Sequence, residues 1–331
     1  MVAASAFALS LGTPALLAEE AVPSFDEWLS GVEQEAAAEG VSDEVVRLAF
    51  EGLAFDPRII EIASRQAEFT ETYQEYAAKR LTPARIAKGR EMMEKYRPEL
   101  DAVAEAYGVP PRFIVAVWGL ETNYGGQTGG FDVVRSLATL GFGSASEPRR
   151  AYFRRELLKA LRILEQGHVD RANLQGSWAG AMGQGQFMPS AFFSFAQDFD
   201  GDGRIDIWGT PADVFASIAN FLRLHGWRED VTWGRAVNLP ASFSEDDDSL
   251  ASEGDKACAA ENRLSKQLTL SEWNALGVRR LNQAMFSSRD SSAVGSPAAG
   301  FGPFRSSQGR QPSAFARVSI VRRVGFRFPR A

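Results

Sequence analysis

The sequence of 331 residues contains few of the residues that build covalent or metal-bound scaffolds. Its single cysteine, Cys258, excludes an internal disulfide and lies far from the N-terminus, so it cannot carry a lipid anchor there. Only two histidines are present, His168 and His225, and neither has a cysteine nearby, which argues against a zinc site. Ser177 has no evident histidine partner either, so we expect no serine-hydrolase triad.

Positive charge and long apolar runs are also scarce. There are 36 Lys and Arg against 42 Asp and Glu, and this net charge of -6 favours no nucleic-acid partner. An uncharged run opens the chain and ends at Glu19-Glu20. It is too short to span a bilayer well and has the length of a signal-peptide apolar region, although a positive N-terminal region is missing. We therefore predict a truncated signal peptide in residues 1–21, cleaved near Ala18 or Ala21, with an ordinary buried helix as the alternative.

A hydrophobic content of 45% is ample for a sizeable core, and the helix signals are strong in the first part of the chain. Ser42 is a predicted N-cap, Asp56-Pro57 breaks the helical spacing, and Thr82-Pro83 begins another helix. We predict a helical region over 22–106. Further helices are predicted over 148–166 and 211–225, and 231–285 is expected to be a small accessory segment with short strands.

The tail over 286–331 differs in composition from the rest of the chain. It contains eight arginines against one aspartate, a net charge of +7, together with many Ser, Gly and Pro residues. This composition predicts a divergent tail that is disordered or encoded in an altered reading frame.

Glu121 follows the apolar run Phe113-Ile114-Val115-Ala116-Val117-Trp118-Gly119-Leu120. Burial there would disfavour the charged carboxylate and raise its pKa, which is what a general acid for glycosidic cleavage requires. The alternative is that Glu121 is the first polar residue at a helix end, in contact with water.

A glycine-rich stretch covers residues 173–190. Its glycines allow close approach of backbone or ligand, and Ser177, Gln184 and Gln186 supply uncharged polar groups beside Trp178 and Phe187. Apolar faces combined with a few polar groups suit a sugar. A tight loop around a core is the structural alternative, and a phosphate-binding P-loop is disfavoured because its lysine is missing.

An aspartate-rich loop begins at Asp198 and continues with Asp200 and Asp202. Aspartates at positions 1, 3 and 5 with glycine at 6 resemble the start of an EF-hand loop, and so favour Ca²⁺. Gly209 stands at position 12, where an EF-hand carries glutamate, so we expect a lengthened loop over 198–213 that Asp213 closes. An exposed acidic turn is the alternative.

Together these motifs resemble the membrane-bound lytic murein transglycosylase B family. The resemblance covers roughly residues 24–285 and is most specific across 107–228. It implies a mainly α (α+β) fold with a lysozyme-like catalytic core at 107–230, the helical region before it and a small EF-hand-like calcium loop. The family ends with a segment that brings a Tyr-Asn or Trp-Asn pair back to the cleft. We expect that segment to be lost here and the similarity to end after Leu281.

The resemblance implies cleavage of the β-1,4 bond between N-acetylmuramic acid and N-acetylglucosamine in peptidoglycan. Glu121 would be the acid and then the base, and the product would carry 1,6-anhydromuramic acid. It also implies sugar or cleft contacts at Ser177, Gln186, Tyr76, Arg149, Arg150, Tyr152, Phe187 and Phe221. The implied Ca²⁺ ligands are Asp198, Asp200, Asp202, the Arg204 carbonyl and Asp213.

We accordingly expect a periplasmic monomer without an organic cofactor, acting on glycan strands, with other cell-wall enzymes as further partners. Two other functions stay open from the residues. A hydrolytic muramidase would need a second carboxylate at a suitable distance from Glu121. A non-catalytic peptidoglycan-binding scaffold would need no acid at that position.

Overall fold

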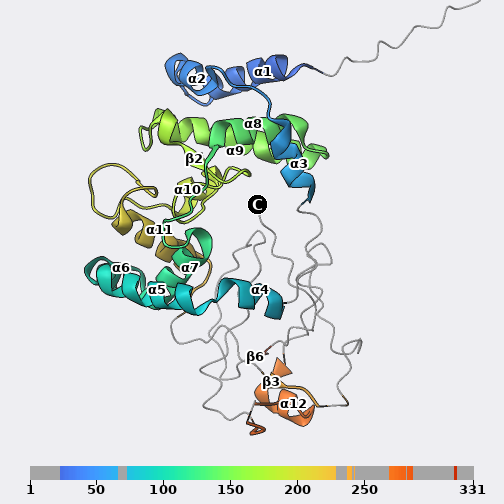
Figure 1. Cartoon of the computed structure of the whole chain (residues 1–331), viewed down its shortest axis with the longest axis vertical. Helices are drawn as coiled ribbons and strands as arrows, with labels where there is room; N and C mark the ends of the chain where they lie inside the picture. Colours follow the sequence, from blue (N-terminus) through green and yellow to red (C-terminus); the bar gives the residue numbers. More distant parts are fainter. Residues whose placement is uncertain are drawn as a thin grey trace, which may run out of the picture.

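The computed structural model describes residues 23–65, 73–228, 237–240, 242, 268–280 and 282–285, with the backbone of residues 317–318. This part of the chain is mainly helical, which confirms the expected fold class (Figure 1). The helices are α1 (Phe25–Ala38), α2 (Asp43–Phe50), α3 (Pro57–Arg65), α4 (Tyr73–Arg80), α5 (Pro83–Lys95), α6 (Arg97–Tyr107), α7 (Pro111–Thr122), α8 (Val133–Gly143), α9 (Glu147–Glu165), α10 (Pro189–Phe195), α11 (Pro211–Leu224) and α12 (Leu270–Ala275), with a 3₁₀ turn η2 (Arg171–Asn173).

The short strands form pairs and no larger sheet within the described residues. They are β1 (Phe131–Asp132) with β2 (Gln175–Gly176), β3 (Val237–Asn238) with β5 (Arg279–Arg280), and β4 (Leu268–Thr269) with β6 (Arg317–Val318), all antiparallel. The short strands expected between 231 and 285 are therefore present. The rest of the tail, like the predicted signal peptide, lies outside the described residues.

The helices begin where local capping chemistry places them. Ser24 and Glu27 form a capping box at α1, in which each side chain accepts a hydrogen bond from the other's backbone N–H. The Ser42 hydroxyl accepts from the first turn of α2, and Thr82 caps α5 with Pro83 at its first position. The helix starts predicted at Ser42 and at Thr82-Pro83 are confirmed.

One hydrophobic cluster, here called the first cluster, joins α1, α2 and α3 to α8, α9 and α10. Its centre is the α8–α9 pair, where Leu137, Leu140, Phe153, Leu157 and Leu161 are at most 1% exposed. Each side chain of this size stabilises the fold by ~1.5–3 kcal/mol on burial. The glycine-rich stretch belongs to the same cluster because Met182 and Phe187 pack into it.

A second cluster joins α5, α6, α7 and α11. Leu100 and Phe215 are fully buried in it, and Trp118 of α7 is 3% exposed. The Trp118 ring packs edge-on against Phe215 with centroids 5.1 Å apart, and against Tyr96 at 5.7 Å. The helix that carries Glu121 is therefore anchored in a different cluster from the glycine-rich stretch.

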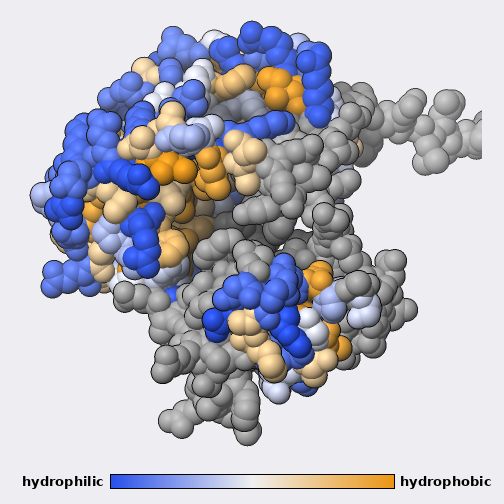
Figure 2. All heavy atoms as spheres, turned by 60° about the horizontal axis from the view of Figure 1, so that its bottom comes forward, coloured by the Kyte–Doolittle hydropathy of each residue, from blue (hydrophilic) through white to orange (hydrophobic). Residues whose placement is uncertain are grey.

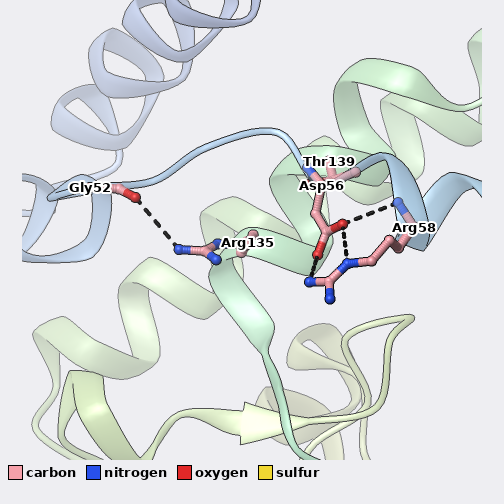
Figure 3. A network of polar contacts seen from close by, with 5 residues as sticks. All are labelled: Gly52, Asp56, Arg58, Arg135 and Thr139. Carbon is pink, nitrogen blue, oxygen red and sulfur yellow. Dashed lines mark hydrogen bonds and ion pairs between the residues drawn. The ribbon is translucent and has the colours of Figure 1, made fainter.

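A polar clamp holds the start of α3 against α8 (Figure 3). The buried Asp56 carboxylate accepts from Arg58 Nε at 2.9 Å and Nη2 at 2.6 Å, and from the Arg58 backbone N–H. Asp56 N–H donates to the Thr139 hydroxyl at 3.2 Å. Arg58 lowers the pKa of Asp56, mainly through the side-chain hydrogen bond. Arg135 of α8 reaches Gly52 in the same region.

Hydrophilic residues cover much of the surface seen in Figure 2, with patches of hydrophobic side chains between them. Within the described residues, no helix combines the length and apolar character needed to cross a membrane.

Candidate active site

Glu121 lies in the last turn of α7, and the backbone enters the left-handed region two residues later. Asn123 and Tyr124 follow with φ of 52° and 61°, in the left-handed region that non-glycine residues rarely adopt. Such residues persist where the surroundings hold them, and they gather at functional sites. Glu121 itself is exposed. The prediction that the protein buries this carboxyl is wrong, because Glu121 lies with Ala116 on the exposed side of α7, while Trp118 and Thr122 lie on the buried side.

Tyr124 holds this left-handed turn in place. Its ring lies in a slot between α5 and α7, and a Cβ added to Gly89 or Gly119 would come within 2.6 Å of it. The Tyr124 hydroxyl donates to the Arg85 carbonyl at 2.7 Å. Lys88 Nζ donates to the Asn123 carbonyl at 3.3 Å. The segment after Glu121 is thus fixed from the side of α5.

The glycine-rich stretch folds into tight turns. Ser177 N–H donates to the Ala181 carbonyl at 2.8 Å, and the Ser177 Oγ accepts from Ala181 N–H at 3.0 Å. Met182 exchanges backbone hydrogen bonds with Phe187. A Cβ on Gly176 would lie 2.1 Å from the Ala181 oxygen, so only glycine fits at that crossing.

Gln186 has a φ of 51°, and its side-chain amide donates to the Thr128 and Gly183 carbonyls, each at 3.1 Å. It therefore joins the loop after Glu121 to the glycine-rich stretch. A Cβ on Gly129 would lie 2.1 Å from the Gly176 oxygen, so the two segments touch backbone to backbone. The structure in this way brings the segments of Glu121, Ser177 and Gln186 together.

Gln184 hydrogen-bonds α7 on one side and the aspartate-rich segment on the other. Its Oε1 accepts from the indole Nε1–H of Trp118 at 2.8 Å, and its Nε2 donates to the Trp208 carbonyl at 2.7 Å. Its own carbonyl accepts from the Thr122 hydroxyl at 2.8 Å. The sequence analysis interpreted Gln184 as a polar group that faces the sugar. In the structure its amide instead makes hydrogen bonds within the protein.

Two of the predicted cleft residues, Phe187 and Phe221, pack edge-on with ring centroids 6.0 Å apart. Phe221 also contacts Phe195 at 5.0 Å and His225 at 4.1 Å. These rings form a continuous aromatic group between the glycine-rich stretch and the end of α11. His225 lies at the C-terminal end of α11, as its sequence position indicated.

The remaining predicted cleft residues lie on α9 and α4. Arg150 donates to Glu147 Oε2 at 2.6 Å and to the Ser144 carbonyl at 2.9 Å, so its guanidinium is held at the start of α9. Arg149 is exposed, and burial raises the pKa of Tyr152 to about 12, with Glu156 adding to the effect. Tyr76 lies in α4, but its side chain lies outside the described residues.

The aspartate-rich loop brings three carboxylates together. Asp198, Asp200 and Asp202 each offer an oxygen, and these oxygens lie within 4.8 Å of one another. All three side chains are exposed, and several of their oxygens accept N–H groups of the loop itself, such as Gly203 N–H on Asp198 at 2.9 Å. An all-oxygen set of this size suits a hard cation such as Ca²⁺.

Asp213 lies behind the loop rather than among these three. It is fully buried, and its two oxygens accept from Phe199 N–H at 2.7 Å and Asp206 N–H at 2.8 Å. Burial raises the pKa of Asp213, an effect that the two backbone hydrogen bonds oppose. Asp213 thus ties both ends of the loop to α11. Arg204 N–H donates to Asp202 Oδ1 at 2.8 Å, which places its peptide in the loop.

The described helices and the site define a mainly helical, lysozyme-like class of protein. A family model for the transglycosylase SLT domain matches residues 24–303, which is most of the chain. The chain therefore belongs to the transglycosylase SLT domain family. This match continues beyond Leu281, so the expectation that the similarity ends there is wrong.

Individual relatives agree with this assignment. The chain is 40% identical over 174 residues to membrane-bound lytic murein transglycosylase B of Escherichia coli strain K12, covering 51% of this chain and 47% of the relative. The chain thus spans about half the length of that curated relative.

Solved structures are similar over more of the chain. SltB3 of Pseudomonas aeruginosa, in complex with NAG-NAM-pentapeptide, has a TM-score of 0.71 and 38% identity, covering 80% of this chain and 66% of SltB3. SltB3 is also known with NAG-anhNAM-pentapeptide, at a TM-score of 0.70. The Escherichia coli lytic transglycosylase Slt35 in complex with calcium has a TM-score of 0.60 and 28% identity, covering 76% of this chain and 74% of Slt35.

The sequence interpretation missed several residues that shape the site. Glu156 is 3% exposed and accepts from Ser190 N–H at 2.9 Å, so it fixes the start of α10 after the glycine-rich stretch. A single glutamate on the apolar face of a predicted helix was the available signal. Thr122 and Trp208 gave no such signal, because their roles depend on contacts with Gln184, which is distant in sequence.

Proposed function

We propose that this protein is a lytic transglycosylase that cleaves the β-1,4 bond between N-acetylmuramic acid and N-acetylglucosamine in peptidoglycan. The observation that carries the proposal is the position of Glu121 at the end of α7, next to the glycine-rich stretch. The two segments that meet there, 121–132 and 173–190, contain one other acidic residue, Asp132, which caps α8 and is paired with Arg171 at 2.7 Å. Family membership and the sugar complexes of SltB3 support the same reaction.

A single carboxyl is sufficient when the substrate supplies its own nucleophile. The Glu121 carboxyl donates its proton to the glycosidic oxygen as the bond from C1 to that oxygen breaks. The resulting carboxylate then takes the proton of the muramic acid 6-hydroxyl, whose oxygen bonds to C1 and closes the 1,6-anhydro ring. Ordinary glycosidases use a second carboxyl to activate water or to attack C1, and this route removes that need.

Because Glu121 is exposed in the free protein, exclusion of water from its carboxyl falls to the bound glycan. A sugar lying over the site would bring its own apolar face against Phe221, whose half-buried ring packs on the buried Phe187. Such desolvation favours the protonated carboxyl that the first step requires. The Ser177 hydroxyl and the Gln186 Oε1 would hydrogen-bond the sugar, because the Gln186 Nε2 already donates to two backbone carbonyls. Arg149, Arg150, Tyr152 and Tyr76 would be outer contacts along the glycan.

We further propose that Asp198, Asp200, Asp202 and the Arg204 carbonyl hold Ca²⁺, with Asp213 securing the loop. The convergence of three carboxylates within 4.8 Å supports this, since they repel one another without a cation. The calcium complex of Slt35 supports it as well. Bound Ca²⁺ would neutralise these charges and stiffen the loop.

We also propose the predicted division of the chain. It consists of a helical region over 22–106, a catalytic core over 107–230 and an accessory segment over 231–285. The family match over residues 24–303 is compatible with this division. A periplasmic location is proposed from the predicted signal peptide and from the substrate. The membrane-bound relative in Escherichia coli is compatible with that compartment.

Digestion of purified peptidoglycan followed by mass spectrometry tests the activity. The wild type should release anhydro-muropeptides, and Glu121→Gln should release none because its amide cannot donate and recover the proton. Glu105→Gln, a change at an exposed glutamate of α6, is the matched control and should leave product formation unchanged.

Two other outcomes would replace the proposal. Products that are one water heavier, with reducing ends, would identify a hydrolytic muramidase. Binding of peptidoglycan without products from the wild type would identify a scaffold.

A further inference from the structure

Gln184 is located where three parts of the site meet. Trp118 and Thr122 of α7, which flank Glu121 on the same helix, donate to its Oε1 and to its backbone carbonyl. On the other side, its Nε2 donates to the Trp208 carbonyl, and its N–H donates to the Ile207 carbonyl at 2.8 Å. Ile207 and Trp208 lie within the aspartate-rich segment, four and three residues before the start of α11.

These contacts leave Gln184 little freedom. A Cβ on Gly125 would lie 2.4 Å from the Gln184 Oε1, so the left-handed turn after Glu121 closes directly over the amide. Gly125 N–H donates to the Thr122 hydroxyl at 3.1 Å, and that hydroxyl donates to the Gln184 carbonyl. Moving the amide would therefore move the end of α7 and the turn that follows it.

The location matters because α7 belongs to the second cluster while the glycine-rich stretch belongs to the first. Apolar packing is non-directional, so it fixes the distance between two clusters better than the rotation of a helix end. Hydrogen bonds fix direction, and those of an amide shielded from water are costly to leave unmade. Gln184 is half-buried.

We propose that Gln184 is a positioning residue. It fixes the position and orientation of the Glu121 carboxyl by tying the end of α7 to Ile207 and Trp208, which follow the aspartate-rich loop. This rests on the proposed transglycosylase function, in which Glu121 must meet first the glycosidic oxygen and then the 6-hydroxyl. Gln184 acts only through Trp118, Thr122 and the turn at Gly125.

Kinetics on a soluble peptidoglycan fragment give the first test, with kcat and KM measured separately. Gln184→Met keeps the size of the side chain and removes both amide hydrogen bonds. We expect kcat to fall about 10- to 100-fold, as for a misplaced catalytic group, with KM changed by less than about 3-fold. Gln197→Met is the matched control, because Gln197 is also half-buried and also makes two side-chain hydrogen bonds, from Tyr107 and to the Ala196 carbonyl.

A pH profile separates positioning from general destabilisation. The carboxyl introduced by Gln184→Glu can donate to the Trp208 carbonyl only while it is protonated. The activity of this variant should approach that of the wild type at low pH and should fall as the new carboxyl ionises. Its pH–activity profile should therefore show an additional decrease that the profiles of the wild type and Gln197→Met lack.

The ¹³C resonance of the Glu121 carboxyl, identified by its loss in Glu121→Gln, gives a readout that does not require turnover. It should move in Gln184→Met and stay in place in Gln197→Met. Superimposed Glu121 resonances in the wild type and Gln184→Met would overturn the inference, as would equal kcat values for Gln184→Met and Gln197→Met. If the wild type made no anhydro product, the proposed function would fail while the resonance still decided the role of Gln184.

Discussion

The two hydrophobic clusters contribute different things to the site. The first cluster is built around the α8–α9 pair and supplies the glycine-rich stretch, whose backbone is folded into tight turns. The second cluster is built around Trp118 and Phe215 and supplies Glu121, the acid of the proposed reaction, on a regular helix. The proposed reaction needs a shaped backbone for the sugar and a rigid support for the acid, and separate parts of the core would meet these two requirements.

Cavities made in either cluster should have the largest effect on the free energy of unfolding. Phe153→Ala in the first cluster and Phe215→Ala in the second each remove a side chain that is at most 1% exposed. Each should cost ~3–5 kcal/mol, measured by denaturant unfolding.

The same two variants test whether the clusters are one cooperative unit. Because α10 and α11 pack together and Gln184 crosses between the clusters, we expect a single transition, shifted in both variants. Two separate transitions in one variant would show that the clusters unfold independently and are not one cooperative unit.

Calcium should stabilise the protein by a somewhat smaller amount. Residues of the aspartate-rich segment pack in both clusters, Phe199 in the second and Ile205 in the first, so a cation there would strengthen their connection. At a free Ca²⁺ concentration 100 times the Kd, the gain is about 2.7 kcal/mol. Thermal unfolding with Ca²⁺ and with a chelator measures it.

Two variants assign any calcium effect to the loop. Asp200→Asn should reduce the stabilisation, whereas Asp170→Asn, at an exposed aspartate outside the three converging carboxylates, should retain it. Equal melting temperatures of the wild type with Ca²⁺ and with chelator would argue against a structural cation.

A pair of threonines separates stability from activity. Thr122 and Thr139 are both fully buried in helices, and each hydroxyl makes a hydrogen bond outside its helix. Thr122→Val and Thr139→Val should each lose ~1–3 kcal/mol. Only Thr122→Val should also lower kcat, because only that hydroxyl joins the end of α7 to Gln184. Equal kcat values in the two variants would count against a polar link at this junction.

Acidification should have the smallest effect on the free energy of unfolding. The effect arises at Asp56, in the clamp between α3 and α8 of the first cluster. Arg58 lowers the pKa of Asp56 below its ordinary value of 3.8, so the folded state favours the carboxylate. Its contribution to stability is present above that ordinary value and is lost as pH falls through the lowered pKa. Unfolding measured between pH 5 and 2 in the wild type and in Asp56→Asn should show this component only in the wild type. Parallel curves would contradict it.

Local chemistry made much of the fold predictable, and long-range contacts explain most of what was not. Ser42 and Thr82-Pro83 predicted helix starts because capping involves only neighbouring residues. Gln184 and Gln186 look equivalent in the sequence, yet one amide bonds to Trp118 and Trp208 while the other bonds to Thr128. These partners are 24 to 66 residues away in sequence, so they cannot be read from either glutamine's surroundings.

The error at Glu121 has a related cause. An apolar run predicts a buried helix, but the run does not show which side of the helix faces the core. Ala116 and Glu121 lie on the exposed side of α7, although Ala116 is apolar like its buried neighbours. The aspartate-rich loop was easier to interpret because its spacing alone brings three carboxylates together.

The slot that Gly89 and Gly119 form around Tyr124 also restricts how this part of the chain can vary over evolution. A methyl group at position 119 would lie 2.6 Å from the Tyr124 ring, and one at position 89 would lie 2.6 Å from its hydroxyl oxygen. Any larger residue at either glycine must therefore arrive together with a smaller residue at 124. In a library of variants these three positions would therefore change together. They are distant in sequence or structure type, because Gly89 lies in α5, Gly119 in α7 and Tyr124 in the turn that follows α7.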